Sequence, residues 1–276
     1  MSFEPFIKIF SVTAIRYFVV AGIPFLLCYV LLKQWLSPAK IQVRHASKQD
    51  FAREILHSMQ TTLVFTVIAC SVFYTPLRNY TQVYTKVADY PTWWLYASVV
   101  LSLVIHDTYF YWMHRLLHHP KLFRYAHLLH HKSTNPSPWT SYSFHFLEAW
   151  TEGLVLLVIV VILPMHALAI GLFVLIGFII NVYGHLGYEI APKWLRHTVL
   201  FQISNTSVHH NLHHSKFTGN YGLYFRFWDR VMGTENPNYV KEYDRVQQNR
   251  VNKKGSDISL YVDANQTNKQ SLAANS

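Results

Sequence analysis

The stretch YFYWMHRLLHHPKLFRYAHLLHHK, from Tyr109 to Lys132, holds six of the seventeen histidines of the chain and no acidic residue. A second histidine cluster, VHHNLHHS, runs from Val208 to Ser215. Residues three and four positions apart share one face of a helix. The spacings HxxxH, HxxHH and HxxHH therefore predict faces rich in imidazole, and we interpret the rest of the chain as a scaffold that brings the two clusters together beside a membrane.

The composition is that of a membrane protein. Hydrophobic residues make up 51% of the 276 residues, and charged residues make up only 14%, whereas soluble domains carry about 25%. The formal net charge of +10 is spread along the chain rather than gathered in one dense tract. We therefore expect the basic residues to set the orientation in the membrane and to meet anionic lipid headgroups, and we expect no nucleic-acid partner.

Three apolar segments, at residues 6–36, 55–77 and 92–113, are each long enough to cross a bilayer, since a spanning helix needs about 20 residues. Lysine and arginine are more frequent in the loop at 37–54 than in the loop at 78–91. Basic loops lie on the cytoplasmic side of membranes. The N-terminus is thus expected outside, and both histidine clusters are expected at the cytoplasmic face.

A fourth apolar segment, Gly153–Tyr183, contains no charged residue. As a single helix it would extend ~46 Å, which exceeds a hydrocarbon core of about 30 Å. Pro164 is expected to divide it into a hairpin, which would return His185 and the second cluster to the side of the first.

These segments predict an all-α, polytopic membrane bundle of four to five membrane helices with a cytoplasmic, histidine-rich helical cap. Residues 1–240 are expected to form one integral-membrane catalytic domain. The polar residues 241–276 are expected to be a disordered tail.

Neutral imidazole is the commonest nitrogen ligand of transition metals in proteins. The clustered histidines are too many for one tetrahedral zinc ion and suit two metal ions. Nitrogen ligation alone leaves iron, zinc, copper and nickel open. The sequence contains neither the HExxH motif of zinc hydrolases nor the two Glu-x-x-His motifs that soluble di-iron bundles use, which favours redox iron that activates O2.

Other interpretations stay open on the residues alone. The histidines could form a solvated, pH-sensing face. The chain could also be a zinc-dependent membrane hydrolase, a divalent-metal transporter, or an inactive lipid-binding protein. A transporter would place its ionisable residues at mid-membrane depth, whereas these histidines lie at the ends of the apolar segments.

Five motifs in order resemble the fatty acid hydroxylase/sterol desaturase superfamily, over roughly His106 to Glu235. They are HRLLHHP (His114–Pro120), HLLHH (His127–His131), NVYGHLGYE (Asn181–Glu189), VHHNLHH (Val208–His214) and NYGLYFRFWDRVMGTE (Asn220–Glu235). The resemblance implies a membrane-bound, non-haem di-iron oxidoreductase that uses O2 to hydroxylate or desaturate a sterol or a fatty acyl chain. It also implies two iron ions, for which zinc could substitute.

The resemblance further implies which residues hold the metals. The implied ligands are His114, His118, His127, His130, His131, His185, His210, His213 and His214. Further candidate residues are His106, His145, Asn181 and His209; some relatives carry histidine at the position of Asn181. Asp107, inside the third apolar segment, is expected to orient a ligand imidazole through the second ring nitrogen.

The chain shows no GxGxxG dinucleotide motif and no CxxCH haem attachment motif. An external electron donor is therefore expected, namely an NAD(P)H reductase acting through cytochrome b5 or a ferredoxin-like carrier. The expected location is a bacterial inner membrane or the endoplasmic reticulum. The sequence does not distinguish which lipid is bound or whether it is hydroxylated or desaturated.

Overall fold

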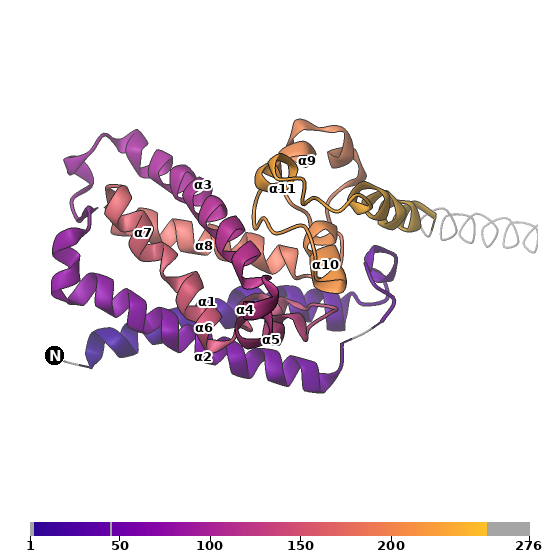
Figure 1. Ribbon diagram of the computed structural model, residues 1–276, viewed down its shortest axis with the longest axis horizontal. Coiled ribbons are helices and arrows are strands. Elements are labelled where there is room, and N and C mark those ends of the chain that lie inside the picture. Colours follow the sequence, from indigo (N-terminus) through magenta and orange to yellow (C-terminus); the bar gives the residue numbers. More distant parts are fainter. Residues whose placement is uncertain (1–2, 45, 253–276) are drawn as a thin grey trace, which may run out of the picture.

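The computed structural model describes residues 3–44 and 46–252, and this part of the chain is a helical bundle (Figure 1). Its α-helices are α1 (Glu4–Phe25), α2 (Lys48–Tyr74), α3 (Thr92–Leu117), α4 (Pro120–Ala126), α5 (Leu128–His131), α6 (Phe146–Gly153), α7 (Val155–Ile162), α8 (Ala167–Gly184), α9 (Val199–Ile203), α10 (Ser207–Lys216) and α11 (Phe227–Val231). Two short strands, β1 (Val83–Tyr84) and β2 (Met165–His166), complete the set of named elements together with short 3₁₀ turns.

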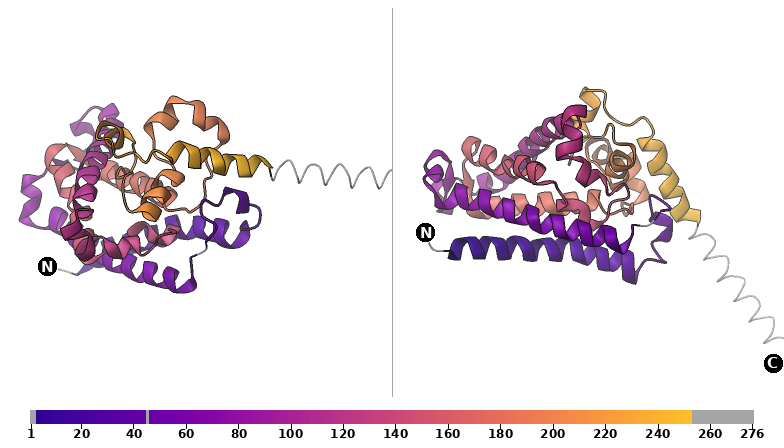
Figure 2. Two further views of the ribbon diagram at one scale, coloured as in Figure 1. Left: turned by 45° about the vertical axis from the view of Figure 1, so that its right-hand side comes forward. Right: turned by 60° about the horizontal axis from the view of Figure 1, so that its bottom comes forward.

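Helices α1 and α2 lie along each other at one side of the bundle (Figure 2). Helix α1 contains Pro24 and continues beyond it as a π-helix, Leu26–Leu31. Proline removes a backbone donor from a helix, and a wider turn accommodates that loss. Helix α2 begins at Ser47, whose hydroxyl and backbone N–H exchange hydrogen bonds with Asp50 as a capping box.

Three of the described helical segments are long and apolar enough to cross a membrane: Glu4–Leu31, Lys48–Tyr74 and Ala167–Gly184. The expected number of membrane helices was four to five. Helix α3, with 26 residues, is long enough to cross a membrane, but it is not among these three segments. It carries His106 and Asp107 in its interior. Helix α7 has only eight residues, which is too short to span alone.

The outer faces of the long helices expose large apolar side chains. Val12 of α1, Leu56 of α2, Val100 of α3 and Ile179 of α8 are 57%, 69%, 61% and 49% exposed, respectively. Exposed apolar surface on several neighbouring helices is what a lipid-facing surface requires. The structure therefore supports the expected all-α membrane bundle.

The predicted break at Pro164 is confirmed. Helix α7 ends at Ile162, α8 begins at Ala167, and β2 between them pairs in parallel with β1. His166 lies in this turn, and its Nε2 donates to the carbonyl oxygen of Thr85 at 2.9 Å. The chain then returns along α8, so that His185 reaches the histidine clusters, as the hairpin prediction required.

The predicted disordered tail is wrong for its first part. Residues 239–252 are helical, and Tyr239, Tyr243 and Val246 are buried against Phe201 of α9 and Leu212 of α10. These three side chains are spaced four and three residues apart, which makes an apolar stripe on a helix whose other residues are polar. The rest of the expected tail, from residue 253 on, lies outside the described residues.

Candidate metal centre

The structure brings all nine implied ligands together in two groups. Within each group the candidate ligand atoms lie within 4.8 Å of one another. The five-histidine group is His114, His118, His127, His131 and His213. The four-histidine group is His130, His185, His210 and His214.

The two HxxHH motifs each serve both groups. His127 and His131, one turn apart, face the five-histidine group, whereas His130 faces the other. In α10, His210 and His214 face the four-histidine group and His213 faces the five-histidine group. Consecutive residues of a helix are rotated by about 100°. The expectation that each HxxHH motif presents one shared ligand face is therefore wrong in this respect.

Backbone carbonyl groups fix the tautomer of five ligand imidazoles. The Nδ1 atoms of His114, His185 and His213 lie 2.9, 2.9 and 2.7 Å from the carbonyl oxygens of Tyr221, Asn181 and Gly219, respectively. A carbonyl oxygen only accepts, so each Nδ1 carries the hydrogen. The same holds for His130 and His214, whose Nδ1 atoms donate to Ser143 at 3.3 Å and to Ser133 at 3.0 Å. The Nε2 atoms of all five are thus left as lone pairs.

These lone pairs face other imidazole nitrogen atoms of the same group. Nε2 of His130 is 3.3 Å from Nε2 of His185, and Nε2 of His185 is 3.0 Å from Nε2 of His210. Two facing lone pairs repel unless a cation or a proton lies near both. Ligand atoms bound at about 2.1 Å from one metal ion are roughly 3.0–3.4 Å apart. The observed separations fit imidazoles that share a metal ion.

The five-histidine group has the same spacing. Nε2 of His131 lies 3.1 Å from Nε2 of His118 and 3.0 Å from Nε2 of His213, and Nε2 of His114 lies 3.0 Å from that of His127. Nine imidazoles without a cysteine ligand suit iron, zinc, copper or nickel. The residues present therefore fit two transition-metal ions, one in each group.

Burial keeps these imidazoles neutral. Desolvation lowers the pKa of His185 and of His213 to about 4. It also places the pKa of His130, His210 and His214 well below the ordinary range, and neighbouring histidines add to the effect. A neutral imidazole is the form that binds a metal.

Glu148, which the histidine spacings did not predict, supports the five-histidine group. Its Oε1 lies 2.6 Å from Nδ1 of His127, and the carboxyl group is 1% exposed. A carboxylate beyond a ligand imidazole fixes the ring orientation and strengthens the ligand. Glu148 ends the segment YSFHFLE, so the signal that could have identified it was an acidic residue close after a histidine motif in an otherwise apolar region.

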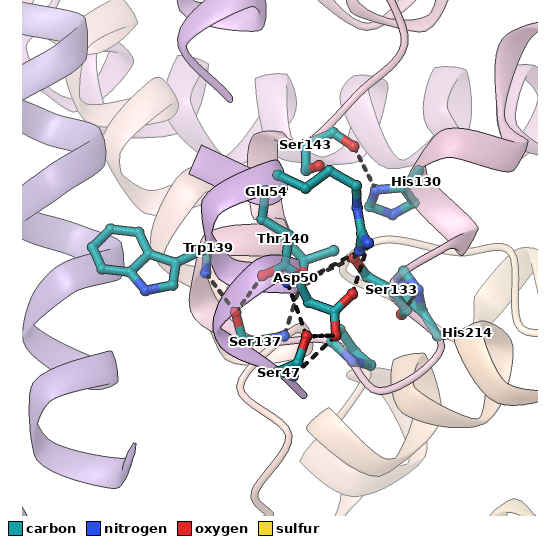
Figure 3. Close-up of polar contacts among 12 residues, drawn as sticks. Ser47, Asp50, Glu54, His130, Ser133, Ser137, Trp139, Thr140, Ser143 and His214 are labelled. Carbon is teal, nitrogen blue, oxygen red and sulfur yellow. Dashed lines mark hydrogen bonds and ion pairs between the residues drawn. The ribbon is translucent and has the colours of Figure 1, made fainter. Parts of the chain in front are cut away.

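A second buried carboxylate supports the four-histidine group from α2 (Figure 3). Glu54 is fully buried and accepts hydrogen bonds from the hydroxyl groups of Ser133 and Ser137, both at 2.6 Å. Ser133 in turn accepts the Nδ1 hydrogen of His214 at its carbonyl oxygen. Glu54 thus fixes the segment that orients a ligand, although it does not touch that ligand.

The expected role of Asp107 is wrong. Its Oδ1 accepts hydrogen bonds from the backbone N–H groups of Leu223, Tyr224 and Phe225 at 3.2, 2.7 and 3.1 Å. None of its hydrogen bonds among the described residues reaches an imidazole. Asp107 instead anchors the loop that follows α10, and this loop includes Tyr221, which fixes His114.

The remaining candidates lie outside both groups. His106 bonds through Nδ1 to the Tyr224 hydroxyl at 2.9 Å. His145 caps the N-terminus of α6, and His209 is buried with its ring against Tyr239. Asn181 contributes its carbonyl oxygen to His185 and donates through Nδ2 to the carbonyl oxygen of Ser141. All four are placed as structural neighbours of the centre rather than as members of the ligand groups.

A cavity of about 560 Å³ lies among α1, α2, α6, α7 and α8. Its lining includes Phe144 and Asn181. The Phe144 ring centroid is 5.2 Å from that of His130, and Asn181 contacts His185. The cavity therefore ends one residue layer from the four-histidine group, and its volume lies within the range of about 300–1,000 Å³ of small-molecule sites.

Comparisons with known proteins agree with the motifs. The fatty acid hydroxylase family profile matches residues 99–234. The chain is 33% identical over 188 residues to a Delta(7)-sterol 5(6)-desaturase of Gibberella zeae, which covers 68% of this chain and 56% of that protein. It is 32% identical over 190 residues to lathosterol oxidase of Rattus norvegicus, which covers 68% of this chain and 62% of that protein.

The matched region thus spans about three fifths of the length of these relatives. Lathosterol oxidase of Homo sapiens is 29% identical over 208 residues, which is 71% of this chain and 68% of that protein. No solved structure matches the chain.

Proposed function

Because the chain belongs to the fatty acid hydroxylase/sterol desaturase superfamily, we propose that it is a membrane-bound, non-haem di-iron oxidoreductase that uses O2 to hydroxylate or desaturate a lipid. The observation that carries this proposal is the arrangement of nine imidazoles, eight of them buried and that of His118 half-buried, in two adjacent groups. Five of them are held by backbone carbonyl groups with Nε2 free to bind a metal.

The five-histidine group would hold one iron ion and the four-histidine group the other. When bound, the two ions would supply the redox chemistry that activates O2 and removes hydrogen from an unactivated C–H bond. The donor set is all nitrogen, which iron accepts.

The residues of the chain would prepare this chemistry in three ways. The carbonyl groups of Tyr221, Asn181 and Gly219 hold their imidazoles in one tautomer, so that no proton competes with the metal at Nε2. Glu148 fixes His127 from the outside. The ligands are almost entirely buried, which keeps bulk water away from a reactive centre.

The lipid would bind in the cavity beside the four-histidine group. Apolar side chains such as Phe65, Ile68 and Leu156 line it, as a hydrocarbon ligand requires. A sterol is the substrate class favoured by the names of the relatives, and a fatty acyl chain is the other class expected of the superfamily. Hydrogen removal is selective because the bound lipid presents one C–H bond to the metals.

Electrons would come from a separate protein. Lys121, Arg124, Lys132 and Lys216 are exposed beside the histidine-bearing helices. Such a basic surface suits an acidic electron carrier of the cytochrome b5 or ferredoxin type that is reduced by an NAD(P)H reductase. We place this surface on the cytoplasmic side of a bacterial inner membrane or of the endoplasmic reticulum, in accordance with the distribution of basic loops.

The proposal is tested by O2 consumption of the detergent-purified, iron-loaded chain with a chemical reductant and a lipid extract. We expect O2 uptake that depends on lipid and a product that gains either one oxygen atom or one double bond, identified by mass spectrometry. Tightly bound zinc without O2 uptake would overturn the proposal and favour a zinc-dependent hydrolase. The matched control is His197→Ala, an exposed histidine outside both groups, which should leave O2 uptake unchanged.

A further inference from the structure

The lining of the cavity beside the metal centre is mainly apolar and includes four polar side chains that we call the polar belt: Arg16, His106, Glu152 and Asn181. These residues come from α1, α3, α6 and α8, which are far apart in the sequence. All four line the same cavity. Their presence in a mainly apolar cavity requires a physical explanation, because burying polar groups without partners costs free energy.

Each member of the belt keeps a polar atom without a protein partner. Nε of Arg16, Nε2 of His106 and Oδ1 of Asn181 are buried and make no hydrogen bond among the described residues. The Glu152 side chain is 8% exposed, and the described part of the chain gives its carboxyl group no hydrogen bond or ion pair. Native proteins leave few buried polar atoms unpaired, so these three atoms, together with the unpaired Glu152 carboxyl group, indicate that a ligand completes them.

The belt lies close to the metal centre. Glu152 follows Glu148 by one helical turn, and Glu148 contacts His127. The carbonyl oxygen of Asn181 contacts His185. A ligand group held by the belt would therefore lie at the inner end of the cavity.

The chemistry of the belt selects among lipid head groups. Arg16 only donates hydrogen bonds, whereas Oδ1 of Asn181 only accepts them. Burial raises the pKa of Glu152 to about 8, so its carboxyl group is mainly protonated near neutral pH and can both donate and accept. A lipid carboxylate or phosphate would satisfy Arg16 but has no hydrogen to donate to Oδ1 of Asn181, whereas an ammonium group would donate to Asn181 and be repelled by Arg16. A hydroxyl group accepts and donates at the same time, so it satisfies both kinds of partner.

We propose that the polar belt is a recognition site for the hydroxyl group of a neutral lipid alcohol, which is bound with this hydroxyl pointing toward the metal centre. The proposal rests on the proposed function and adds the substrate class and its orientation. The apolar body of the lipid then lies along Phe65, Ile68 and Leu156. Glu152 and Arg16 act as specificity-determining residues.

A competing arrangement is also testable. Lys8 and Arg78 line the same cavity, and Lys8 is exposed. An acidic lipid would bind with its head group between these two residues and with its hydrocarbon tail toward the metals. This arrangement predicts preferential binding of a fatty acid and no role for Glu152.

The test measures binding without turnover, so that it is independent of iron and of O2 chemistry. The full chain in lipid nanodiscs, without reductant, is titrated with tritiated cholesterol, with its 3-deoxy analogue cholest-5-ene, with 1-hexadecanol, with hexadecane and with palmitic acid. We expect at least one alcohol to bind about 10-fold more tightly than its hydrocarbon partner, because the hydrocarbon leaves the belt unpaired. Equal binding of alcohol and hydrocarbon in both pairs, or tightest binding of palmitic acid, would overturn the proposal.

Variants assign the preference to the belt. Glu152→Leu and Arg16→Leu should each abolish the preference for the alcohol, whereas Glu152→Gln, which keeps an accepting oxygen, should retain part of it. The matched control is Glu4→Leu, an exposed carboxylate outside the cavity, which should leave binding unchanged. An unchanged preference in Glu152→Leu would contradict the assignment.

A further variant, at a residue outside the polar belt, tests whether the cavity itself holds the lipid. Gly171 lines the cavity, and a Cβ atom placed there would meet nothing within 4 Å. Gly171→Leu should therefore fill part of the cavity without a clash and weaken the binding of alcohol and hydrocarbon alike. Undiminished binding in this variant would show that the lipid binds elsewhere and would also overturn the proposal. If these binding results hold while O2 uptake fails, the proposed function alone is contradicted.

Discussion

At the residue scale, the two nitrogen atoms of each ligand imidazole have separate roles. In five ligands Nδ1 donates to a backbone carbonyl group, and Nε2 is thereby kept free of hydrogen. The spacing of the histidines predicted which residues gather, because i and i+4 neighbours share a helix face. It did not predict which group each neighbour joins, because that depends on how α5 and α10 are rotated against each other.

The carboxylate of Glu148 gives a prediction at this scale. Glu148→Leu removes the oxygen that lies opposite Nδ1 of His127 and leaves no acceptor there. We expect metal affinity to fall about 10- to 100-fold, as is typical when the outer partner of a ligand histidine is removed. Competition with a chelator measures this change; Glu242→Leu, outside both histidine groups, is the control, and equal affinities in wild type and Glu148→Leu would refute the role.

The lowered histidine pKa values give a pH dependence. An unfolded histidine has a pKa of about 6.5, whereas burial lowers that of His185 and His213 to about 4. The unfolded state therefore binds more protons as the pH falls through 6.5, and folding is weakened between about pH 6.5 and 4. Thermal unfolding of the metal-free chain should show a lower Tm at pH 5 than at pH 7.5, and a constant Tm would contradict neutral, buried imidazoles.

At the scale of elements, the loop after α10 depends on one side chain of α3. Asp107 accepts three backbone N–H groups of residues 223–225. The sequence showed an ionisable residue inside an apolar helix and therefore predicted a special role. Its partners could not be predicted, because they lie 116 to 118 positions further along the chain.

Asp107→Ala should destabilise the protein strongly. The substitution leaves three buried N–H groups without an acceptor, and each unpaired group costs about 1–3 kcal/mol. Asp107→Asn keeps one accepting oxygen and should cost less. Thermal unfolding in detergent measures the difference, and an Asp107→Ala variant as stable as Asp107→Asn would show that these hydrogen bonds contribute little.

At the scale of the whole molecule, length and hydropathy predicted the all-α bundle and the hairpin at Pro164. The helix at 239–252 was not predicted, because its few apolar side chains lie within a polar segment and become significant only when Phe201 and Leu212 cover them. Contacts between distant segments likewise determine how the ligands divide into two groups, where Glu148 lies and where the cavity forms. Composition indicates whether a chain faces lipid or water, whereas these features depend on how distant segments pack against each other.

The orientation in the membrane is a prediction for the whole molecule. Lys86 lies near the β1–β2 end and Lys216 lies beside the histidine groups. The test uses a chain in which Cys28 and Cys70 are replaced by alanine. In this chain, Lys86→Cys should react with a membrane-impermeant maleimide only from the non-cytoplasmic side of the membrane, and Lys216→Cys only from the cytoplasmic side. Labelling of both from the same side would contradict this topology.

The central claim is that two iron ions are bound, one by each histidine group, and metal content measures it most directly. The chain purified after iron-supplemented expression should contain about two iron atoms per molecule by mass spectrometry of the metal. His130→Ala and His213→Ala, each in a different group, should each lower this content, and His197→Ala should not. A wild-type content near zero, a content of zinc in place of iron, or full retention in both variants would contradict the account.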